Sequence, residues 1–387
     1  MESTFDIILN PETPLTIDAP IDHNELCARV RFRHDVLTKM PDDEVIGRER
    51  FTADRIAILQ SMGVRVTPTL TPGIHAKLTD VCRRLLLSDP LRLYIEADPE
   101  VNASAMHGGK HCVMSLTSGL ANLLTLDEIG AVIGHELGHI GLQHAHQRVE
   151  GGMARIFVLE SARAAEVSCD RLAIIAAGKC RTAVSAMLKI SCGLNAHHLT
   201  LDVDAFLTQL AERPAEADME WEAMQDHPVL PFRVWAMTRF AATDLCISLL
   251  GGEGGEPFEK VEDEISTRFK TIGAGLVARA VTDHLHEALA WLGVLIVCED
   301  GSESEIEIST LTTLTGSIWA EDAIEYMKLH GAQAVKARAK DSLRALSMAH
   351  PSVKDRVRLH STRFIESLNA HAMKAQIDVL IDEAWRR

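Results

Sequence analysis

The apolar residues of the 387-residue chain are spaced mainly as in helices. They recur three or four positions apart, which is the period of a helix with one buried face. This spacing predicts helices over 21–62 (two helices, separated by Pro41), 74–87, 126–146 and 154–177, with further helical stretches to residue 250. Residues 258–387 are helical in pattern almost throughout. The chain is therefore predicted to be mostly α-helical.

Two short segments have the alternation of β-strands instead. In LRLYIEAD, residues 91–98, every second residue is apolar, and HCVMSL, residues 111–116, is a second short apolar run. Alternation of this kind places one face of a strand in the core. The segment 98–110 between them is predicted to be a loop. The fold class is thus predicted to be mostly α, of the α+β type, with a small antiparallel sheet.

Glycine and proline divide the chain into segments. GGEGGEP, residues 251–257, cannot continue a helix and is predicted to be a linker. The predicted organisation is an N-terminal helical segment over 1–62, a central domain over 63–250, and a helical C-terminal domain over 258–387. No repeat of solenoid period is present in the sequence.

Charge and composition exclude several classes of function. Lys and Arg number 39 and Asp and Glu number 55, so the formal net charge is −16. An acidic balance argues against nucleic acid or an anionic membrane surface as partner. No uninterrupted apolar run reaches the roughly 18 to 20 residues of a membrane-spanning helix. No secretory signal is visible, and the eight Cys form no C-x-x-C pair. A soluble cytoplasmic protein is predicted.

The sequence GHELGHI contains H-E-x-x-H at His135, Glu136 and His139. Four residues along a helix advance by about 400° and rise about 6 Å, so both imidazoles project from one face. Glu136 lies about 100° around the helix, where a base could take a proton from a water beside the metal. Two imidazoles suit zinc, and one zinc ion per chain is predicted. The competing interpretation is two hydrogen-bonded core histidines and an ion-paired glutamate.

The third metal ligand decides the subclass of the site. A metzincin motif would place Gly at position 142 and His at position 145, but the chain has Leu142 and Ala145. That class is therefore excluded. His144 and His146 lie too near along the chain to reach the same ion, and we predict that both face solvent.

The following helix offers carboxylates at the required spacing. Glu166 and Asp170 lie four residues apart on one face. Glu166 would complete a His, His, Glu site that leaves the fourth position to water, and Asp170 would accept the free N–H of a liganding imidazole. The alternatives are a surface ion pair of Glu166 with Arg163 or Arg171, and Glu160 as the ligand.

Four ordered motifs resemble the catalytic core of metallopeptidase family forty-eight, the HtpX-like gluzincin zinc peptidases related to the CAAX prenyl proteases. Asn102 and Ala103 match the Asn-Ala motif that precedes H-E-x-x-H in that family. EVSCDRLA resembles its Glu-x-x-Ala-Asp segment, with Cys169 in place of Ala. DHPVLPFR, residues 226–233, resembles its His-Pro-x-x-x-x-Arg segment. The resemblance covers about 65–245.

The resemblance implies a role for each motif residue. The zinc ligands would be His135, His139 and Glu166. Glu136 would be the general base and then the proton donor to the leaving amine, with Asp170 behind a ligand. His227 would face the open coordination position, and Arg233 would hold its loop or steady the oxyanion. His227 has two other interpretations, a histidine that caps a helix before Pro228 and a plug on the metal that keeps the enzyme latent.

The family implies a metalloendopeptidase that acts on extended or unfolded polypeptides, in protein quality control. The strand at 111–115 would be the sheet edge that pairs with substrate main chain. Relatives of this kind are membrane-embedded, and the chain resembles a soluble branch.

Two other functions stay open at this point. One is a latent or non-catalytic zinc protein that acts as a holdase or scaffold through its helical C-terminal region, 258–387, with a protein partner bound there. The other is a proenzyme in which 1–62 or 258–387 covers the cleft. The C-terminal region faintly resembles TerB-like helical domains, and Ser302 with Glu305 is predicted to form a capping box there.

Overall fold

The computed structural model describes residues 21–35, 42–87, 91–108, 111–144, 152–212, 220–272, 274–298, 304–347 and 352–386. The chain forms two compact units. Unit 1 comprises Met1–Gln147 and Glu160–Ile272, and unit 2 comprises Arg148–Leu159 and Gly273–Arg387. The glycine-rich segment 251–257 lies within unit 1. The domain boundaries given above stay a prediction.

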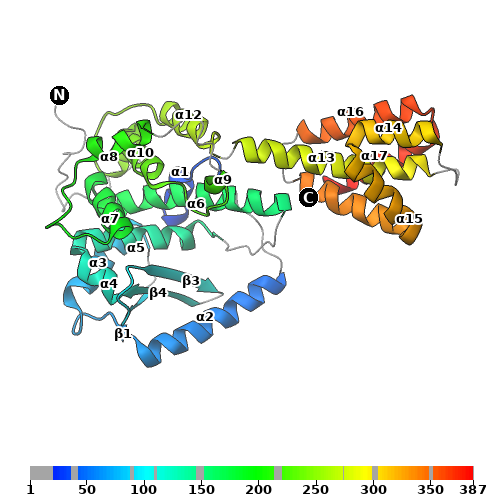
Figure 1. Ribbon diagram of the computed structural model, residues 1–387. Helices are drawn as coiled ribbons and strands as arrows, with labels where there is room; N and C mark the ends of the chain where they lie inside the picture. The colour runs from blue at the N-terminus through cyan, green and yellow to red at the C-terminus, as the bar shows by residue number, and fades with distance from the viewer. Residues whose placement is uncertain are drawn as a thin grey trace. The chain divides into compact units, whose positions relative to one another are not determined.

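The predicted mostly α, α+β fold is confirmed, and unit 1 holds the sheet (Figure 1). Its helices are α1 (His23–Val30), α2 (Asp42–Met62), α3 (Pro72–Arg84), α4 (Ser118–Leu123), α5 (Leu126–Gly141), α6 (Gly152–Ala177), α7 (Cys180–Cys192), α8 (Val203–Ala211), α9 (Glu220–Ala223), α10 (Leu230–Ala241), α11 (Asp244–Leu249) and α12 (Phe258–Phe269). Residues of α6 belong to unit 1 from Glu160 onward.

The sheet of unit 1 has four strands in the described residues. They are β1 (Val64–Arg65), β2 (Arg92–Glu96), β3 (Ala103–Gly108) and β4 (His111–Thr117), in the order β1-β2-β4-β3. The prediction of an antiparallel sheet is wrong in one pairing, because β2 and β4 run parallel while the outer pairs are antiparallel. The chain passes through β3 before it enters β4, and this reversal turns β4 parallel to β2.

The edge of the sheet also differs from the prediction. Residues 103–108, predicted to be part of a loop, form β3, whose small residues give little strand signal. Since β4 pairs on both sides, the predicted strand at 111–115 is not the edge, and β3 is. Both α2 and α5 contact β3, and Figure 1 shows the sheet between these helices.

The N-terminus of α5 is fixed by a buried polar cluster. Thr125 and Glu128 form a capping box, in which each side chain bonds the backbone N–H of the other. Glu128 also accepts hydrogen bonds from Ser185 at 2.6 Å and from Lys189 at 2.8 Å, both on α7. These bonds satisfy a carboxylate that is only 5% exposed, and they hold α5 and α7 together.

Two glycines allow α5 and α6 to pack closely. A Cβ added to Gly134 would lie 2.2 Å from the Cβ of Ala176, and one added to Gly138 would lie 3.0 Å from the Sγ of Cys169. The first distance is too short for a side chain, and the second is tight. The two backbones therefore approach more closely at Gly134 than any other residue would permit, and this approach brings the α5 histidines to α6.

Unit 2 is helical in its described residues. It contains α13 (Ala274–Val297), α14 (Glu305–Thr315), α15 (Ser317–Ser347, kinked at Gly331), α16 (Ser352–Ser367), a short 3₁₀ helix (His371–Met373) and α17 (Lys374–Ala384). The central helix, α13, packs against α14, α15 and α16. The capping box of α14 is formed by Ser304 and Glu307, two residues later than predicted. Ser302 lies outside the described residues.

One segment of α13 passes a length and composition test for a membrane span. It is Ala278–Val297, and 67% of its apolar window is buried inside the fold. Buried core helices pass the same test, and α13 is packed among its neighbours in unit 2 in that way. The helix is therefore weak support for a membrane span, which the sequence did not predict.

Candidate active site

The two histidines of the motif on α5 face a glutamate on α6. The Nε2 atom of His135 lies 3.3 Å from Oε2 of Glu166, and the Nε2 atom of His139 lies 3.3 Å from Oε1. The two imidazole rings are 5.1 Å apart and nearly perpendicular. The side chains predicted to be ligands therefore converge on one point, as the i, i+4 spacing requires.

The donor set fits a zinc ion. Ligand atoms at about 2.0–2.1 Å from a tetrahedral zinc lie about 3.3–3.4 Å apart, which matches both measured separations. Among the described residues, His135, His139 and Glu166 form a group whose ligand atoms all lie within 4.8 Å of one another. The Oε2 atom of Glu166 is buried and has no hydrogen bond of good geometry. A cation at this point would satisfy it.

Asp170 and Arg233 contact the side chains predicted to be zinc ligands. Oδ1 of Asp170 lies 3.1 Å from Nδ1 of His135. Arg233, on α10, donates to both oxygens of Asp170, at 2.8 and 2.6 Å, and its Nη2 lies 3.0 Å from Oε2 of Glu166. The arginine thus holds two buried carboxylates in one orientation. Its predicted roles, at the loop or at an oxyanion, stay predictions.

The charges of this network stabilise one another. Burial opposes ionisation, but the charges of Arg233 and His135 hold the pKa of Glu166 well below its usual value. The pKa of Asp170 is lowered by Arg233 in the same way, against burial. Although burial lowers it, the pKa of His135 is raised to about 10 by Glu166 and Asp170. The site therefore stabilises positive charge between its carboxylates.

Glu136 lines a cleft that opens beside this point. The cleft has a volume of about 170 Å³. Its lining residues come from α4, α5, α6, α7, α10 and the start of β3. The small or apolar ones include Ala103, Ala131, Val132, Ala183, Ala186, Met187 and Ile190. His135, Glu166, His227 and Arg233 also line it. The cleft therefore has its polar groups at the metal-binding point and an apolar wall beyond it.

His227 lies beside the group of ligands. Its Nε2 atom is 3.4 Å from Oε1 of Glu166, and its Nδ1 atom is 2.7 Å from Oδ1 of Asp226. The side chain is 55% exposed. Among the described residues, His227 does not belong to any group of three whose ligand atoms lie within 4.8 Å of one another. Helix α10 begins three residues later, at Leu230, with Val229 as its N-cap.

Sequence reasoning missed Arg163, which holds the turn before His227. This arginine is 1% exposed, and its Nη1 donates to the carbonyl oxygens of Ala223 and Gln225, both at 2.7 Å. The predicted alternative, a surface ion pair of Glu166 with Arg163 or Arg171, is wrong because both arginines are buried. Nothing near Arg163 in the sequence indicates these partners, which lie about 60 positions away. The fallback ligand Glu160 is outside the metal-binding groups of the described residues.

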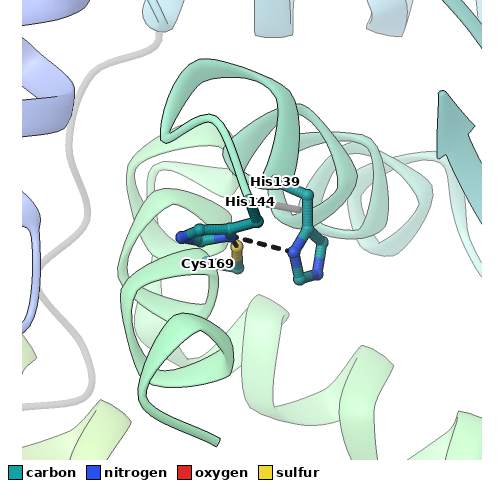
Figure 2. Close-up of side chains that lie close together, drawn as sticks. All are labelled: His139, His144 and Cys169. Atoms are coloured by element: carbon teal, nitrogen blue, oxygen red, sulfur yellow. Dashed lines mark hydrogen bonds between the residues drawn. The ribbon is translucent and has the colours of Figure 1, made fainter. Parts of the chain in front are cut away.

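The prediction for His144 is also wrong. It was expected to face solvent, but its side chain is only 12% exposed, and Nδ1 lies 3.0 Å from Nδ1 of His139 (Figure 2). The turn that follows α5 folds it back against that helix. His146 lies outside the described residues.

Comparison with known proteins identifies a family for the central part of the chain. Residues 68–158 match the family model of peptidase family M48. The match includes His135, Glu136 and His139 and ends before Glu166. The resemblance stated from the motifs is thereby confirmed.

Individual relatives agree with this match. The chain is 29% identical over 177 residues to the plastoglobule-localized metallopeptidase 48 of Arabidopsis thaliana, a match that covers 40% of this chain and 51% of the relative. It is 33% identical over 91 residues to a protease HtpX homolog of Pelotomaculum thermopropionicum, covering 23% and 32%. It is 33% identical over 95 residues to the metalloprotease LoiP of Escherichia coli, covering 24% and 36%.

The matches span about a third to a half of the length of these relatives. No solved structure matches the chain significantly.

Proposed function

Because residues 68–158 match the family model of peptidase family M48, we propose that the chain is a zinc-dependent endopeptidase that cleaves extended or unfolded polypeptides. One observation carries the proposal. Two imidazole nitrogens each lie 3.3 Å from a Glu166 oxygen, beside a cleft that Glu136 lines. Three protein ligands with a neighbouring carboxylate are the arrangement of a catalytic zinc site.

The chemistry divides between the ion and the chain. Zinc at this site would act as a Lewis acid and lower the pKa of a coordinated water toward about 7. Glu136 takes the proton of the attacking water on its carboxylate and delivers it to the amine that leaves. His227, oriented by Asp226 through Nδ1, directs Nε2 toward the oxyanion that develops on the peptide carbonyl. Arg233 keeps Glu166 and Asp170 charged and oriented.

The sheet edge supports an extended substrate. Strand β3 is the last strand of the described sheet, it contacts α5, and its first residue, Ala103, lines the cleft. An unpaired strand edge binds another extended chain through main-chain hydrogen bonds, with little dependence on sequence. Polypeptides that are unfolded can supply such a chain, which favours a role in protein quality control.

The apolar wall of the cleft favours a large apolar side chain next to the cleaved bond. A cavity of about 150 Å³ lined by apolar side chains is large enough for benzene, and this cleft has a volume of about 170 Å³. The small side chains of Ala183 and Ala186, which line the cleft, leave room for a large apolar side chain. Sequencing the fragments of an unfolded protein should therefore find cuts beside Leu, Phe or Met in excess.

The latent or non-catalytic alternative depends on His227 as a fourth metal ligand. The ligand atoms of a tetrahedral site would all lie about 3.3–3.4 Å apart. His227 meets that distance to Glu166 but lies outside the group that contains both motif histidines. This favours a helper over a plug. The cytoplasmic location and a protein partner for 258–387 stay predictions.

The first test replaces the proposed base. Glu136→Gln should retain zinc but reduce the cleavage of a dye-labelled unfolded protein by at least about 10²-fold, because the amide takes no proton. Glu212→Gln, at an exposed position after α8, is the matched control and should cleave normally. Undiminished cleavage by Glu136→Gln would show that the assignment is wrong.

The second test separates helper from plug. His227→Ala should lower kcat by about 10²-fold, the loss expected when one oxyanion donor is removed. A rise in activity would instead support the latent form. Zinc content measured on the same samples shows whether the ion stays bound.

A further inference from the structure

The two motif histidines differ in what binds their second ring nitrogen. Nδ1 of His135 faces the carboxylate of Asp170 directly, at 3.1 Å. Nδ1 of His139 faces Nδ1 of His144 at 3.0 Å, and Nε2 of His144 lies 3.0 Å from Oδ2 of Asp35. A second imidazole therefore stands between His139 and its carboxylate.

The ring nitrogens allow one consistent assignment of protons. A histidine that binds a metal through Nε2 keeps its proton on Nδ1, so His139 donates to His144. Nδ1 of His144 is then the acceptor, and its own proton is on Nε2. That proton is donated to the carboxylate of Asp35. Each of the two hydrogen bonds, His139 to His144 and His144 to Asp35, thus has one donor and one acceptor.

Asp35, at the far end of this series of hydrogen bonds, is held firmly in place. Asp35 is 5% exposed and accepts a hydrogen bond of 2.7 Å from the hydroxyl of Ser168, on α6. The same Ser168 oxygen accepts the backbone N–H of Phe32 at 2.9 Å. Arg31 donates to the carbonyl of Leu142 at 3.0 Å and lies 3.4 Å from Asp35. The turn after α1 is therefore fixed to both helices of the metal centre.

We propose that His144 and Asp35 form a positioning relay, which fixes the tautomer and ring orientation of His139 and thereby strengthens zinc binding. The proposal rests on the zinc site proposed above. In this proposal, residues 31–35 are part of the metal centre. They lie more than a hundred positions before Glu166 and outside the family match. Partners of this kind typically change metal affinity by about 10- to 100-fold.

A second metal ion is the competing interpretation. His139, His144 and Cys169 form another group whose ligand atoms lie within 4.8 Å, and Figure 2 shows them together. The Nδ1–Nδ1 distance of 3.0 Å is that of a hydrogen bond, and Sγ of Cys169 is farther, 3.6 Å from His144. Burial also raises the pKa of the Cys169 thiol, and metals bind the thiolate.

The test compares three substitutions in the full chain by zinc competition with a chromophoric chelator. His144→Leu removes both hydrogen bonds and should raise the Kd for zinc about 10- to 100-fold. His144→Gln should restore most of the affinity, because its amide oxygen can accept from His139 and its NH₂ can donate to Asp35. His198→Leu, in an exposed turn, is the matched control and should bind zinc as the parent does.

A second variant covers the case in which His144→Leu does not fold. Asp35→Asn keeps an acceptor for His144 but removes the charge, and should weaken zinc binding by a smaller factor. If both act through His139, the double variant should bind zinc no more weakly than His144→Leu alone. The thermal midpoints of the metal-free variants separate this effect from a loss of stability.

The outcomes are distinct. Unchanged zinc affinity in His144→Leu overturns the relay, as does equal weakening by His144→Gln. Two zinc ions per chain, reduced to one by Cys169→Ala, would establish the second metal instead. If the parent binds zinc and His144→Leu weakens it while no peptide is cleaved, the relay stands and the proposed peptidase activity fails.

Discussion

The two units of the chain differ in what they bury. Among the described residues of unit 1, eight ionisable side chains of Glu, Asp, Arg and Lys that lie on helices are buried: Glu128, Arg163, Glu166, Asp170, Arg171, Lys189, Glu222 and Glu262. The buried polar residues described in unit 2 are three hydroxyls, on Thr315, Ser342 and Ser361. The rest of the core described in unit 2 consists of apolar side chains.

This difference indicates which unit carries the chemistry. An apolar core stabilises a fold through burial alone, which does not require any polar group to have a fixed orientation. A buried charge is costly unless a partner of defined geometry is present, and Arg233 with Asp170 and Lys189 with Glu128 supply such pairs. Unit 1 therefore contains buried charged groups that cost stability but have fixed orientations. Several of these groups surround the proposed zinc site.

The largest expected effect comes from breaking a buried pair in unit 1. Arg171 pairs with Glu262, donates to the carbonyl of Val30 at 3.1 Å, and lies over the ring of Phe240 at 5.0 Å. Arg171→Met leaves Glu262 charged and buried, and should lower the free energy of unfolding by about 3–5 kcal/mol. Hydrogen exchange, measured over peptides of unit 1, gives the change in the free energy of unfolding.

Two further variants test the interpretation of that loss. Replacing both partners, as Arg171→Met with Glu262→Leu, should recover part of it, because the buried carboxylate that lost Arg171 is then removed as well. Leu343→Ala in unit 2 should cost about 2–5 kcal/mol in exchange over α15 and leave zinc affinity unchanged. Equal losses in the single and double charge variants would contradict the comparison of the two units.

Local spacing accounts for what could be predicted of the site. The i, i+4 pairs on two successive helices place His135 and His139 toward Glu166, and helical geometry alone determines these faces. The helices themselves followed from apolar periodicity and from Pro41. The sheet was predicted less well, because the residues of β3 are small and its pairing with β4 is a tertiary contact.

Contacts between distant segments account for what was missed. His144 was expected in solvent because nothing near it in the sequence shows that Asp35, 109 positions away, would accept its proton. Arg163 and Arg171 were expected on the surface because arginine usually lies there. Their partners, the carbonyls after α9 and Glu262 on α12, are again remote in sequence.

A smaller effect is expected from the close approach of α5 and α6. Gly134→Ala places a Cβ 2.2 Å from that of Ala176, so the helices must separate, at a cost of about 1–3 kcal/mol. Zinc affinity should fall as well, because His135 moves away from Glu166. Gly130→Ala, one turn earlier, meets the flexible side chain of Lys77 and lies at an ordinary contact distance of 3.4 Å from Val81, so it should be neutral or slightly stabilising. Equal effects of the two variants on stability and zinc affinity would show that the close approach of α5 and α6 does not determine either property.

The smallest expected effect has the opposite sign and lies in unit 2. Ser361 is 3% exposed, and its hydroxyl has no hydrogen-bond partner among the described residues. Because an unsatisfied buried hydroxyl is unfavourable, Ser361→Ala should stabilise unit 2 by about 1 kcal/mol. Thr315→Val is the matched control, since the Thr315 hydroxyl donates to the carbonyl of Leu311 at 2.9 Å and its removal should cost about 1 kcal/mol. Hydrogen exchange over α14 and α16 measures both. If Ser361→Ala is destabilised instead, unit 2 also depends on a buried polar contact. The two units would then differ only in the buried charged residues of unit 1.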